Sequence, residues 1–359
     1  MSRTPGTREE HIRSIERALE HEGRLLRHVA DAGVESVGPE EARAALDEAL
    51  LRYGEWRGRS IRRRHRAAGV TLTARSLLEQ WGTGDVHGPL ELGWGEATGS
   101  SRLVSLTIRR SPEWTHLARG PRWLPALYHR SLFRGVARGY GDGLEVTVPD
   151  EGFGLTAPYT VAWIVAGAPD DDAGPVSSRA LADPEGAYRV SELTMQSRAA
   201  LWAFLARGLL DRFDANGEWA AREGARRFGA ERGSEIREVV IGRGRPVDMA
   251  GILENYDSGG DHIWKWKDEG HLSPGTWRQE CTYCPFVPVW RELHAMDLGY
   301  IYDYEFHLAQ YRAYHPGARV AWEALQTRGD ATCLFHFSIP ELRQPDDPGC
   351  GGTPPPGEA

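Results

Sequence analysis

The 359-residue chain has few cysteines, very little lysine and no long apolar run. Four cysteines in a chain of this length exclude a disulfide-stabilised secreted scaffold. No stretch approaches the roughly 18 apolar residues that a membrane-spanning helix needs. The N-terminal MSRTPGTREEHIRS lacks the apolar core of a secretory signal. We therefore expect a cytoplasmic protein with reduced thiols.

Basic residues are not in excess either. The chain has 43 Lys+Arg against 51 Asp+Glu, a formal net charge of −8. This balance argues against nucleic acid or an anionic membrane surface as a partner. Only Lys265 and Lys267 are lysines, a bias most simply explained by codon usage in a high-GC genome. The expected partner is a small-molecule substrate, and the expected assembly is a monomer or a homodimer.

The length predicts about two domains, and helical and β-like patterns alternate along the chain. Apolar residues at helical spacing predict helices over 8–33 and 38–67, and short β-like runs follow between 77 and 148. After a segment rich in Pro, Asp and Gly, helical material returns at 191–232 and β-like material from about 235. The pattern predicts an α+β fold in which antiparallel sheets carry packed helices.

Two anchors in the same order predict a tandem duplication. Gly54-Glu55-Trp56 is similar to Gly217-Glu218-Trp219, and the segment starting at Leu77 is similar to the one starting at Ile252. A weaker pair joins Gly141-Asp142 to Gly329-Asp330. We expect the copies to pack as an intramolecular pseudo-dimer. The expected units are an N-terminal degenerate repeat (1–165), a linker (166–187), a C-terminal repeat (188–340) and a disordered tail (341–359).

All four cysteines lie in or after the second copy, at positions 281, 284, 333 and 350. The first copy has Ser111-Pro112 near the position of Cys284-Pro285, and Glu145 near that of Cys333. Serine is a weak nucleophile without a dedicated base. The second copy is therefore expected to hold the chemistry.

The Cys281-x-x-Cys284 spacing leaves several interpretations open. A four-cysteine zinc site needs a second such pair, which is absent, although a mixed site with Cys284, Cys333 and His or Glu remains open. Proline after Cys284 is favoured in the first turn of a helix, which would place the thiol at a positive helix end. Such a thiol is a candidate nucleophile, and the alternative is a buried small apolar residue.

Two further segments carry candidate site residues. In the helix-like stretch from Tyr302 to Tyr311, Glu305 and His307 are two residues apart, so at most one of them faces a given pocket. In IWKWK, period-2 alternation places Trp264 and Trp266 on one face and the two lysines on the other. That strand either binds an anion beside a pocket or is an edge strand guarded by lysines.

The second half also resembles the L-2-amino-thiazoline-4-carboxylic acid hydrolase family. The motifs that carry the resemblance are Cys284-Pro285, His315-Pro316, Gln326-Thr327, Gly329-Asp330, Cys333 and Phe335. It covers roughly 190–340 and, through the repeat, faintly 38–150. The closing motif is also similar to the end of 4-vinyl reductase domains, which bind small molecules. Tyr302 stands where the family has its middle cysteine, and Glu305 where it has the following aspartate.

This resemblance implies a hydrolase-like enzyme that makes or breaks a C–N or C–S bond in a small heterocyclic or amino-acid-derived substrate, in bacterial specialised metabolism. The implied catalytic residues are Cys284, Glu305, His307 and Cys333, with one of the middle two as general acid/base. The implied substrate-binding residues are Trp264, Lys265, Trp266, Tyr302 and Asp330. No cofactor is expected, with zinc as the open alternative. Two other functions stay open: a non-catalytic small-molecule-binding or sensing protein, and a cyclase or dehydratase on the same fold.

Overall fold

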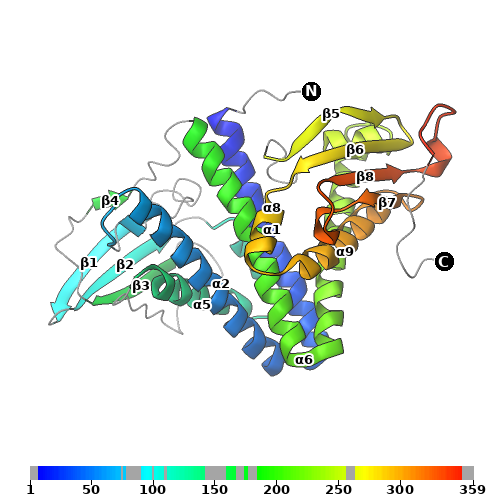
Figure 1. Ribbon diagram of the computed structural model, residues 1–359. Coiled ribbons are helices and arrows are strands. Elements are labelled where there is room, and N and C mark those ends of the chain that lie inside the picture. Colours follow the sequence, from blue (N-terminus) through cyan, green and yellow to red (C-terminus); the bar gives the residue numbers. More distant parts are fainter. Residues whose placement is uncertain are drawn as a thin grey trace.

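Two small sheets lie at opposite ends of the protein, with long helices between them (Figure 1). The computed structural model describes residues 7–73, 76–77, 90–98, 101–108, 111–141, 159–166, 174–176, 184–255 and 263–349. Both sheets are antiparallel and both are flanked by helices. The α+β class predicted from the sequence is confirmed.

The first half begins with two long helices, α1 (Arg8–Val37) and α2 (Pro39–Ala67). Thr7 and Glu10 form a reciprocal capping box at the start of α1, in which the Thr7 backbone N–H donates to Glu10 Oε2 at 2.6 Å. Gly38 joins the helices at a φ of 87°, and Pro39 occupies the first position of α2. These local signals explain why two helices form here instead of one.

The rest of the first half supplies the first sheet and the helices beside it. In chain order these elements are β1 (Leu90–Thr98), β2 (Ser101–Ile108), α4 (Trp114–Leu117), α5 (Leu124–Tyr140), β3 (Tyr159–Ala166) and β4 (Gly174–Val176). The strands pair in the order β3-β2-β1-β4.

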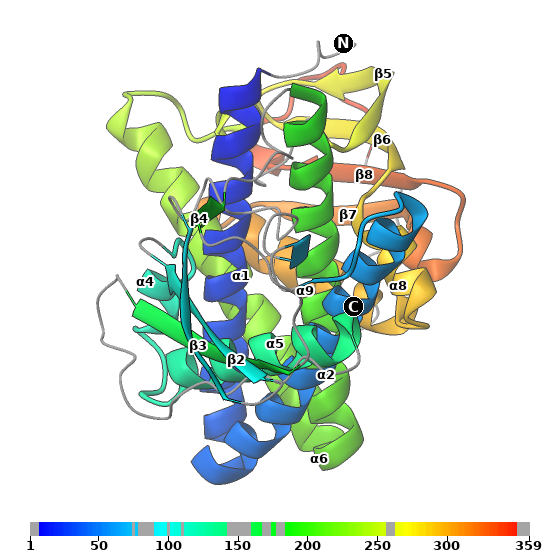
Figure 2. The same cartoon turned by 90° about the vertical axis from the view of Figure 1, so that its left-hand side faces the viewer.

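The second half begins with α6 (Pro184–Gly242), which folds back on itself at Asp214. Asp214 has a φ of 47° and a ψ of −122°, and the helix continues on either side of it as two arms. α1 packs along both arms, because Gly33 approaches the Leu209 side chain on the first arm and Val29 approaches Gly224 on the second. Figure 2 shows α1 and α6 side by side from a second direction.

The second sheet follows α6. The elements in chain order are α7 (Met249–Glu254), β5 (Lys265–Leu272), β6 (Thr276–Tyr283), α8 (Phe286–Glu292), α9 (Met296–Tyr314), β7 (Arg319–Ala324), the 3₁₀ turn η2 (Gln326–Arg328), β8 (Cys333–Ser338) and the 3₁₀ turn η3 (Pro340–Leu342). The strands pair in the order β5-β6-β8-β7.

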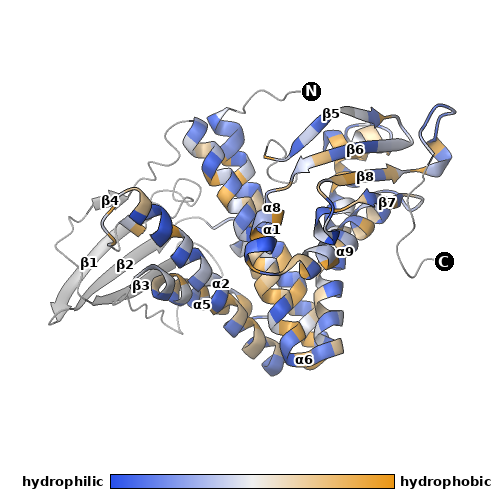
Figure 3. Cartoon of the chain, viewed as in Figure 1, coloured by the Kyte–Doolittle hydropathy of each residue, from blue (hydrophilic) through white to orange (hydrophobic). Residues whose placement is uncertain are grey.

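Two large apolar cores form inside this framework. One fills the space between the long helices and takes residues from both halves, and Figure 3 shows apolar segments gathered where α6 meets its neighbouring helices. The other lies between α9 and the second sheet. Trp264 and Cys284 pack against both cores. Cys284, the predicted nucleophile, therefore lies at the junction between the two cores.

The two halves share one packing feature: in each, glycines let two helices cross with their backbones in close contact. In the first half, a Cβ at Gly54 or Gly58 on α2 would collide with the carbonyl oxygens of Leu132 and Val136 on α5. In the second half, a Cβ at Gly229 or Gly233 on α6 would collide with the carbonyl oxygens of Phe306 and Gln310 on α9. Both crossings use glycines four residues apart, which lie on one helix face.

This crossing corrects one anchor of the predicted repeat. Gly54 corresponds in packing to Gly229, whereas Gly217 lies against the Leu209 carbonyl beside the fold-back of α6. Trp56 is 8% exposed and Trp219 is 43% exposed, so these two residues have different environments as well. The separation from Gly54 to Gly229 is 175 residues, equal to the separation from Leu77 to Ile252.

Three described strands of each sheet are neighbours in the same order, β1-β2-β3 in the first sheet and β5-β6-β8 in the second. The fourth strand differs, however, because β4 extends the first sheet beside β1, whereas β7 extends the second sheet beside β8. The tandem duplication, and with it the pseudo-dimer, is therefore not confirmed. Glu145, offered as the counterpart of Cys333, lies outside the described residues.

Two regular elements fall inside the segment that was expected to be a linker. α6 already starts at Pro184 and β4 occupies 174–176, both inside the expected linker. Residues 341–349 of the expected disordered tail are ordered, because the buried Asp347 accepts hydrogen bonds from Ser273 at 2.9 Å and from Thr276 at 3.1 Å. The remaining tail positions lie outside the described residues.

In the parts of the chain that the structure describes, no helix combines the length and the apolar character needed to cross a bilayer.

Candidate functional site

Cys284 lies directly before α8, at the junction of the two cores. Burial raises the pKa of the Cys284 thiol to about 12, and the negative charge of Asp303 raises it further. The backbone N–H groups of Phe286 and Val287 and the side chain of Trp264 act in the opposite direction, and the Val287 N–H also donates to the Cys284 carbonyl oxygen at 3.3 Å. The resting sulfur is therefore a neutral thiol near pH 7.

Two more thiols lie beside Cys284. Cys281 on β6 and Cys333 on β8 are directly paired across adjacent strands, and all three cysteines are free. The Cys281 thiol donates to the Tyr283 carbonyl at 3.2 Å. Burial, the largest cause, raises the pKa of both Cys281 and Cys333, and neighbouring negative charge raises each further. Both are therefore neutral, weakly reactive thiols at pH 7.

Asp303, on α9, places a carboxyl group among these thiols. Its negative charge is the second-largest cause of the raised pKa of both Cys284 and Cys333. Burial raises the pKa of Asp303 itself to about 7, opposed only by the Thr327 hydroxyl, which donates to Oδ2 at 3.1 Å. A carboxyl with this pKa exists in both protonation states near neutral pH, which suits it to accept and return a proton.

The turn between β7 and β8 holds this arrangement in place. The Gln326 backbone N–H lies 3.3 Å from the Cys333 sulfur, next to the Thr327 contact with Asp303. Asp330 accepts from the Leu325 backbone N–H at 2.7 Å, and Gly329 adopts a φ of 97° that favours glycine. The Gln-Thr…Gly-Asp motif therefore folds into a turn that presents one backbone donor and one hydroxyl to the site.

His307 lies one helical turn after Asp303 on the same face of α9. Its Nδ1–H donates to the Asp303 carbonyl oxygen at 2.8 Å, so Nε2 is the unprotonated ring nitrogen. Burial lowers the His307 pKa to about 4, and the ring packs against Phe335 and Phe337 of β8. At pH 7 this imidazole is neutral.

Two residues predicted on α9 pack toward the long helices. Glu305 is buried against α6, where it accepts from Arg222 at 3.0 Å and from Arg226 at 2.8 Å. Tyr302 is buried in the helical core, stacked on Phe306 with ring centroids 5.3 Å apart. Glu305 lies on a different face of α9 from Asp303 and His307. It pairs with arginines of α6 and stabilises the packing of the two helices.

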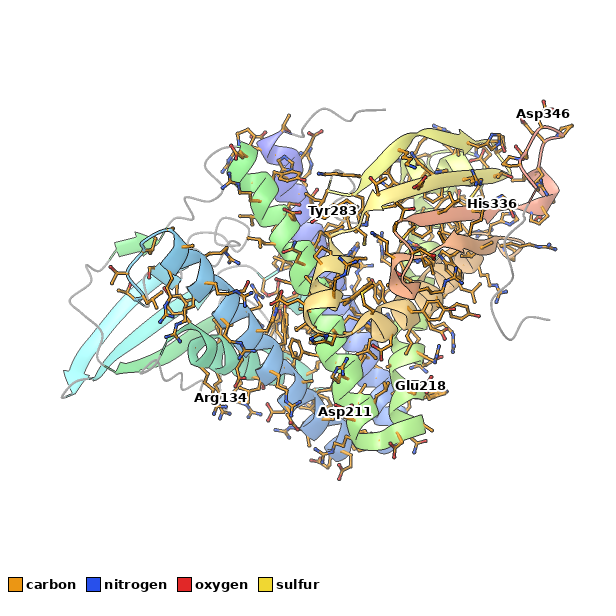
Figure 4. All side chains as sticks on the ribbon, viewed as in Figure 1. Arg134, Asp211, Glu218, Tyr283, His336 and Asp346 are labelled. Atoms are coloured by element: carbon orange, nitrogen blue, oxygen red, sulfur yellow. The ribbon has the colours of Figure 1, made fainter. Side chains whose placement is uncertain are left out.

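In the IWKWK segment the two tryptophans are partly buried and the two lysines are exposed, as the alternation predicts. Trp264 packs edge-on against Phe286, and Trp266 packs against Trp277 and Phe335, so both tryptophans contribute to apolar packing. Lys265 is exposed, with Nζ 5.5 Å from the centre of the Tyr283 ring. Figure 4 shows Tyr283 where β6 reaches the long helices, and there its hydroxyl donates to Glu192 at 2.5 Å.

The structure therefore gathers Cys284, Cys333 and His307 with Trp264 beside them, and adds two residues that the sequence analysis missed. Asp303 lies four residues before His307, a helical spacing that points to it in the sequence, whereas the family pattern points to Glu305. Thr327 was named only as part of a motif. Asp330 lies in the supporting turn, exposed to solvent.

Among the described residues, no group of three or more His, Cys, Asp or Glu side chains is arranged to hold a metal ion.

The site lies within a recognised family domain. Residues 194–337 match the L-2-amino-thiazoline-4-carboxylic acid hydrolase family. The match runs from the first arm of α6 to β8 and includes every residue of the thiol cluster, whereas the first half has no family match. No curated protein and no solved structure matches the chain significantly. The family description indicates a hydrolase-like function on a small substrate.

Proposed function

We propose that the second half hydrolyses a C–N or C–S bond in a small heterocyclic or amino-acid-derived substrate, with Cys284 as nucleophile and Asp303 as general acid/base. The observation that carries the proposal is the proximity of a thiol, its N–H donors and a carboxyl with a pKa of about 7. A resting thiol needs a base that takes its proton as it attacks. The ionised form of Asp303 is such a base.

The proposed reaction has two steps. The Cys284 sulfur attacks a carbon bonded to nitrogen and sulfur while its proton moves to Asp303, and the C–N or C–S bond breaks as Asp303 protonates the leaving atom. Water then attacks the covalent intermediate, again giving a proton to Asp303, and the Cys284 sulfur leaves and takes that proton back. The N–H groups of Phe286, Val287 and Trp264 stabilise the sulfur whenever it carries negative charge.

His307 and Cys333 have supporting roles in this proposal. His307 holds the Asp303 backbone through its Nδ1–H and offers a neutral Nε2 near the aromatic wall of β8. Cys333 receives the Gln326 N–H and contributes apolar surface beside Cys284. Neither is placed as the nucleophile, because Cys333 is 4% exposed and lacks the donor set of Cys284.

The test uses the compound in the family description. Purified protein is incubated with L-2-amino-thiazoline-4-carboxylic acid and related cyclic amidines, and products and intact protein mass are followed by mass spectrometry. We expect turnover of at least one compound and an adduct that maps to Cys284. The matched control is Cys350→Ala, which removes a thiol outside the family match and is expected to keep full activity.

The outcomes separate the roles of the two residues. Full turnover by Cys284→Ala would remove the nucleophile role and leave Asp303 as the base for direct attack by water. Saturable binding without turnover in the parent protein would favour the non-catalytic binding function over the enzyme.

A further inference from the structure

The turn between β7 and β8 contains a residue that contacts the proposed catalytic carboxyl group without being one of the reacting groups. Thr327 is the middle residue of η2 and is 7% exposed. Its hydroxyl donates to Asp303 Oδ2 at 3.1 Å. Among the residues that the structure describes, Thr327 is the one hydrogen-bond donor to this carboxyl group, and it engages Oδ2 alone.

The turn fixes the position of Thr327 by closing on itself. The Leu325 N–H donates to Asp330 Oδ2 at 2.7 Å, and the Asp330 N–H donates back to the Leu325 carbonyl oxygen at 3.2 Å. Inside this ring, the Gly329 N–H donates to the Gln326 carbonyl oxygen at 3.1 Å. Threonine itself has few side-chain rotamers, because it is branched at Cβ. The hydroxyl is therefore directed at α9 before any substrate binds.

The other titratable groups around Asp303 do not stabilise its negative charge. They are Cys284 before α8, Cys333 on β8, Cys281 on β6, and Tyr302 and His307 on α9. All are neutral near pH 7, because burial raises the pKa of the thiols and of the tyrosine hydroxyl and lowers that of the imidazole. The charged side chains of the turn, Arg328 and Asp330, are exposed to solvent.

We propose that Thr327 is the positioning residue for the acid/base of the site: by holding Oδ2 of Asp303, it stabilises the carboxylate and leaves Oδ1 to exchange the proton with Cys284 and the substrate. This inference rests on the proposed function. A hydroxyl that donates to a carboxylate favours its ionised form, which is the form that accepts a proton. A cation in the same place would favour that form more strongly and oppose the return of the proton. A neutral hydroxyl suits a group that must do both.

The experiment measures the ionisation of Asp303 directly and needs no substrate. Full-length protein is labelled with carbon-13 at the aspartate side-chain carboxyl, and its resonances are followed by NMR from pH 5 to 9.5. The titrating resonance that is missing from Asp303→Asn identifies Asp303. In the parent protein we expect a pKa of about 7. In Thr327→Val, which removes the hydroxyl, the midpoint should rise by about one pH unit.

Two further variants separate the hydroxyl from the packing of the side chain. Thr327→Ser retains the hydroxyl and should titrate like the parent protein. Thr282→Val is the matched control, since that exposed hydroxyl donates to the Lys265 carbonyl oxygen at 3.1 Å on the same sheet, and it should leave the midpoint unchanged. The inference is overturned if Thr327→Val titrates like the parent protein, or if the midpoint rises equally in Thr327→Val and Thr327→Ser.

Turnover gives a second, independent readout. If Asp303 is the base, kcat of Thr327→Val should be about fivefold lower than that of the parent protein at pH 7 and nearly equal at pH 9, where both carboxyl groups are ionised. An equal loss at both pH values would show a merely structural role and would contradict the inference. The titration stands without turnover, so a protein that hydrolyses none of the compounds removes the proposed function while the measured contact of Thr327 with Asp303 is retained.

Discussion

The two halves of the protein use the same helix crossing to support different chemistry. Glycines four residues apart let α2 meet α5 and let the second arm of α6 meet α9 at backbone distance. Beside the first crossing lie two buried carboxylates, Glu22 and Glu113, and beside the second lie three thiols and a carboxyl. The comparison shows that small residues in the helices set the framework, whereas the segments next to each crossing decide the chemistry.

The largest expected effect compares Cys284 with Ser111, which precedes Pro112 shortly before α4. Cys284→Ala should lower kcat/KM at least about a thousandfold because the nucleophile is lost. Ser111→Ala should stay within a factor of about two, because the first half does not take part in hydrolysis. Steady-state kinetics on the folded variants measure both values of kcat/KM. A larger loss in Ser111→Ala than in Cys284→Ala would show that the catalytic site lies in the first half.

The next comparison is between two carboxylates on α9. Asp303→Asn should lower kcat about a hundredfold or more. In the parent protein, activity should rise as the pH increases through about 7, because Asp303 must lose its proton to act as the base. Asp303→Asn should lack that rise in its pH–rate profile.

Glu305→Gln is the matched control for that variant. It should keep the pH profile and lose stability, by roughly 1–2 kcal/mol in chemical denaturation, because two partly exposed arginines lose their buried partner. If Glu305→Gln abolishes turnover at an unchanged fold while Asp303→Asn does not, the assignment of the acid/base is wrong.

The importance of the glycines at the two helix crossings can be tested by replacing them with alanine. Gly58→Ala on α2 and Gly233→Ala on α6 should each lower the free energy of unfolding by about 2–3 kcal/mol, because each methyl group would overlap a carbonyl oxygen. Urea denaturation measures both. A large cost in one half with none in the other would show that the crossings are not equivalent.

A smaller, pH-dependent effect is expected at Glu22. Its pKa is raised above the value in the unfolded chain, so its ionisation destabilises the fold, and the penalty grows as the pH rises from about 4.5 through 7. Glu22→Gln should therefore be more stable than the parent by about 3 kcal/mol at pH 8 and nearly equal at pH 4. Greater stability of the parent at pH 8 would mean that Glu22 is satisfied in the fold.

The sequence predicted the fold class and the half that holds the thiols, because cysteine positions and helical spacing are local features. It misplaced the first repeat anchor, since Gly54 and Gly217 share neighbours in sequence but not in packing. It missed Asp303, whose four-residue spacing from His307 is visible in the sequence; only the burial that raises the Asp303 pKa is a tertiary feature that local spacing does not report. The burial of Glu22, which is 1% exposed, could not be predicted either, because it depends on how the helices pack together.

The central claim, that Cys284 and Asp303 act as a coupled pair, has a direct test that needs no substrate. The rate of Cys284 alkylation by iodoacetamide is measured from pH 6 to 10 by peptide mass spectrometry, in Cys350→Ala protein with Asp303 or with Asn at that position. Asp303→Asn removes the negative charge that raises the Cys284 pKa, so alkylation at pH 8–9 should become several-fold faster. Identical pH profiles in the two proteins would contradict the account.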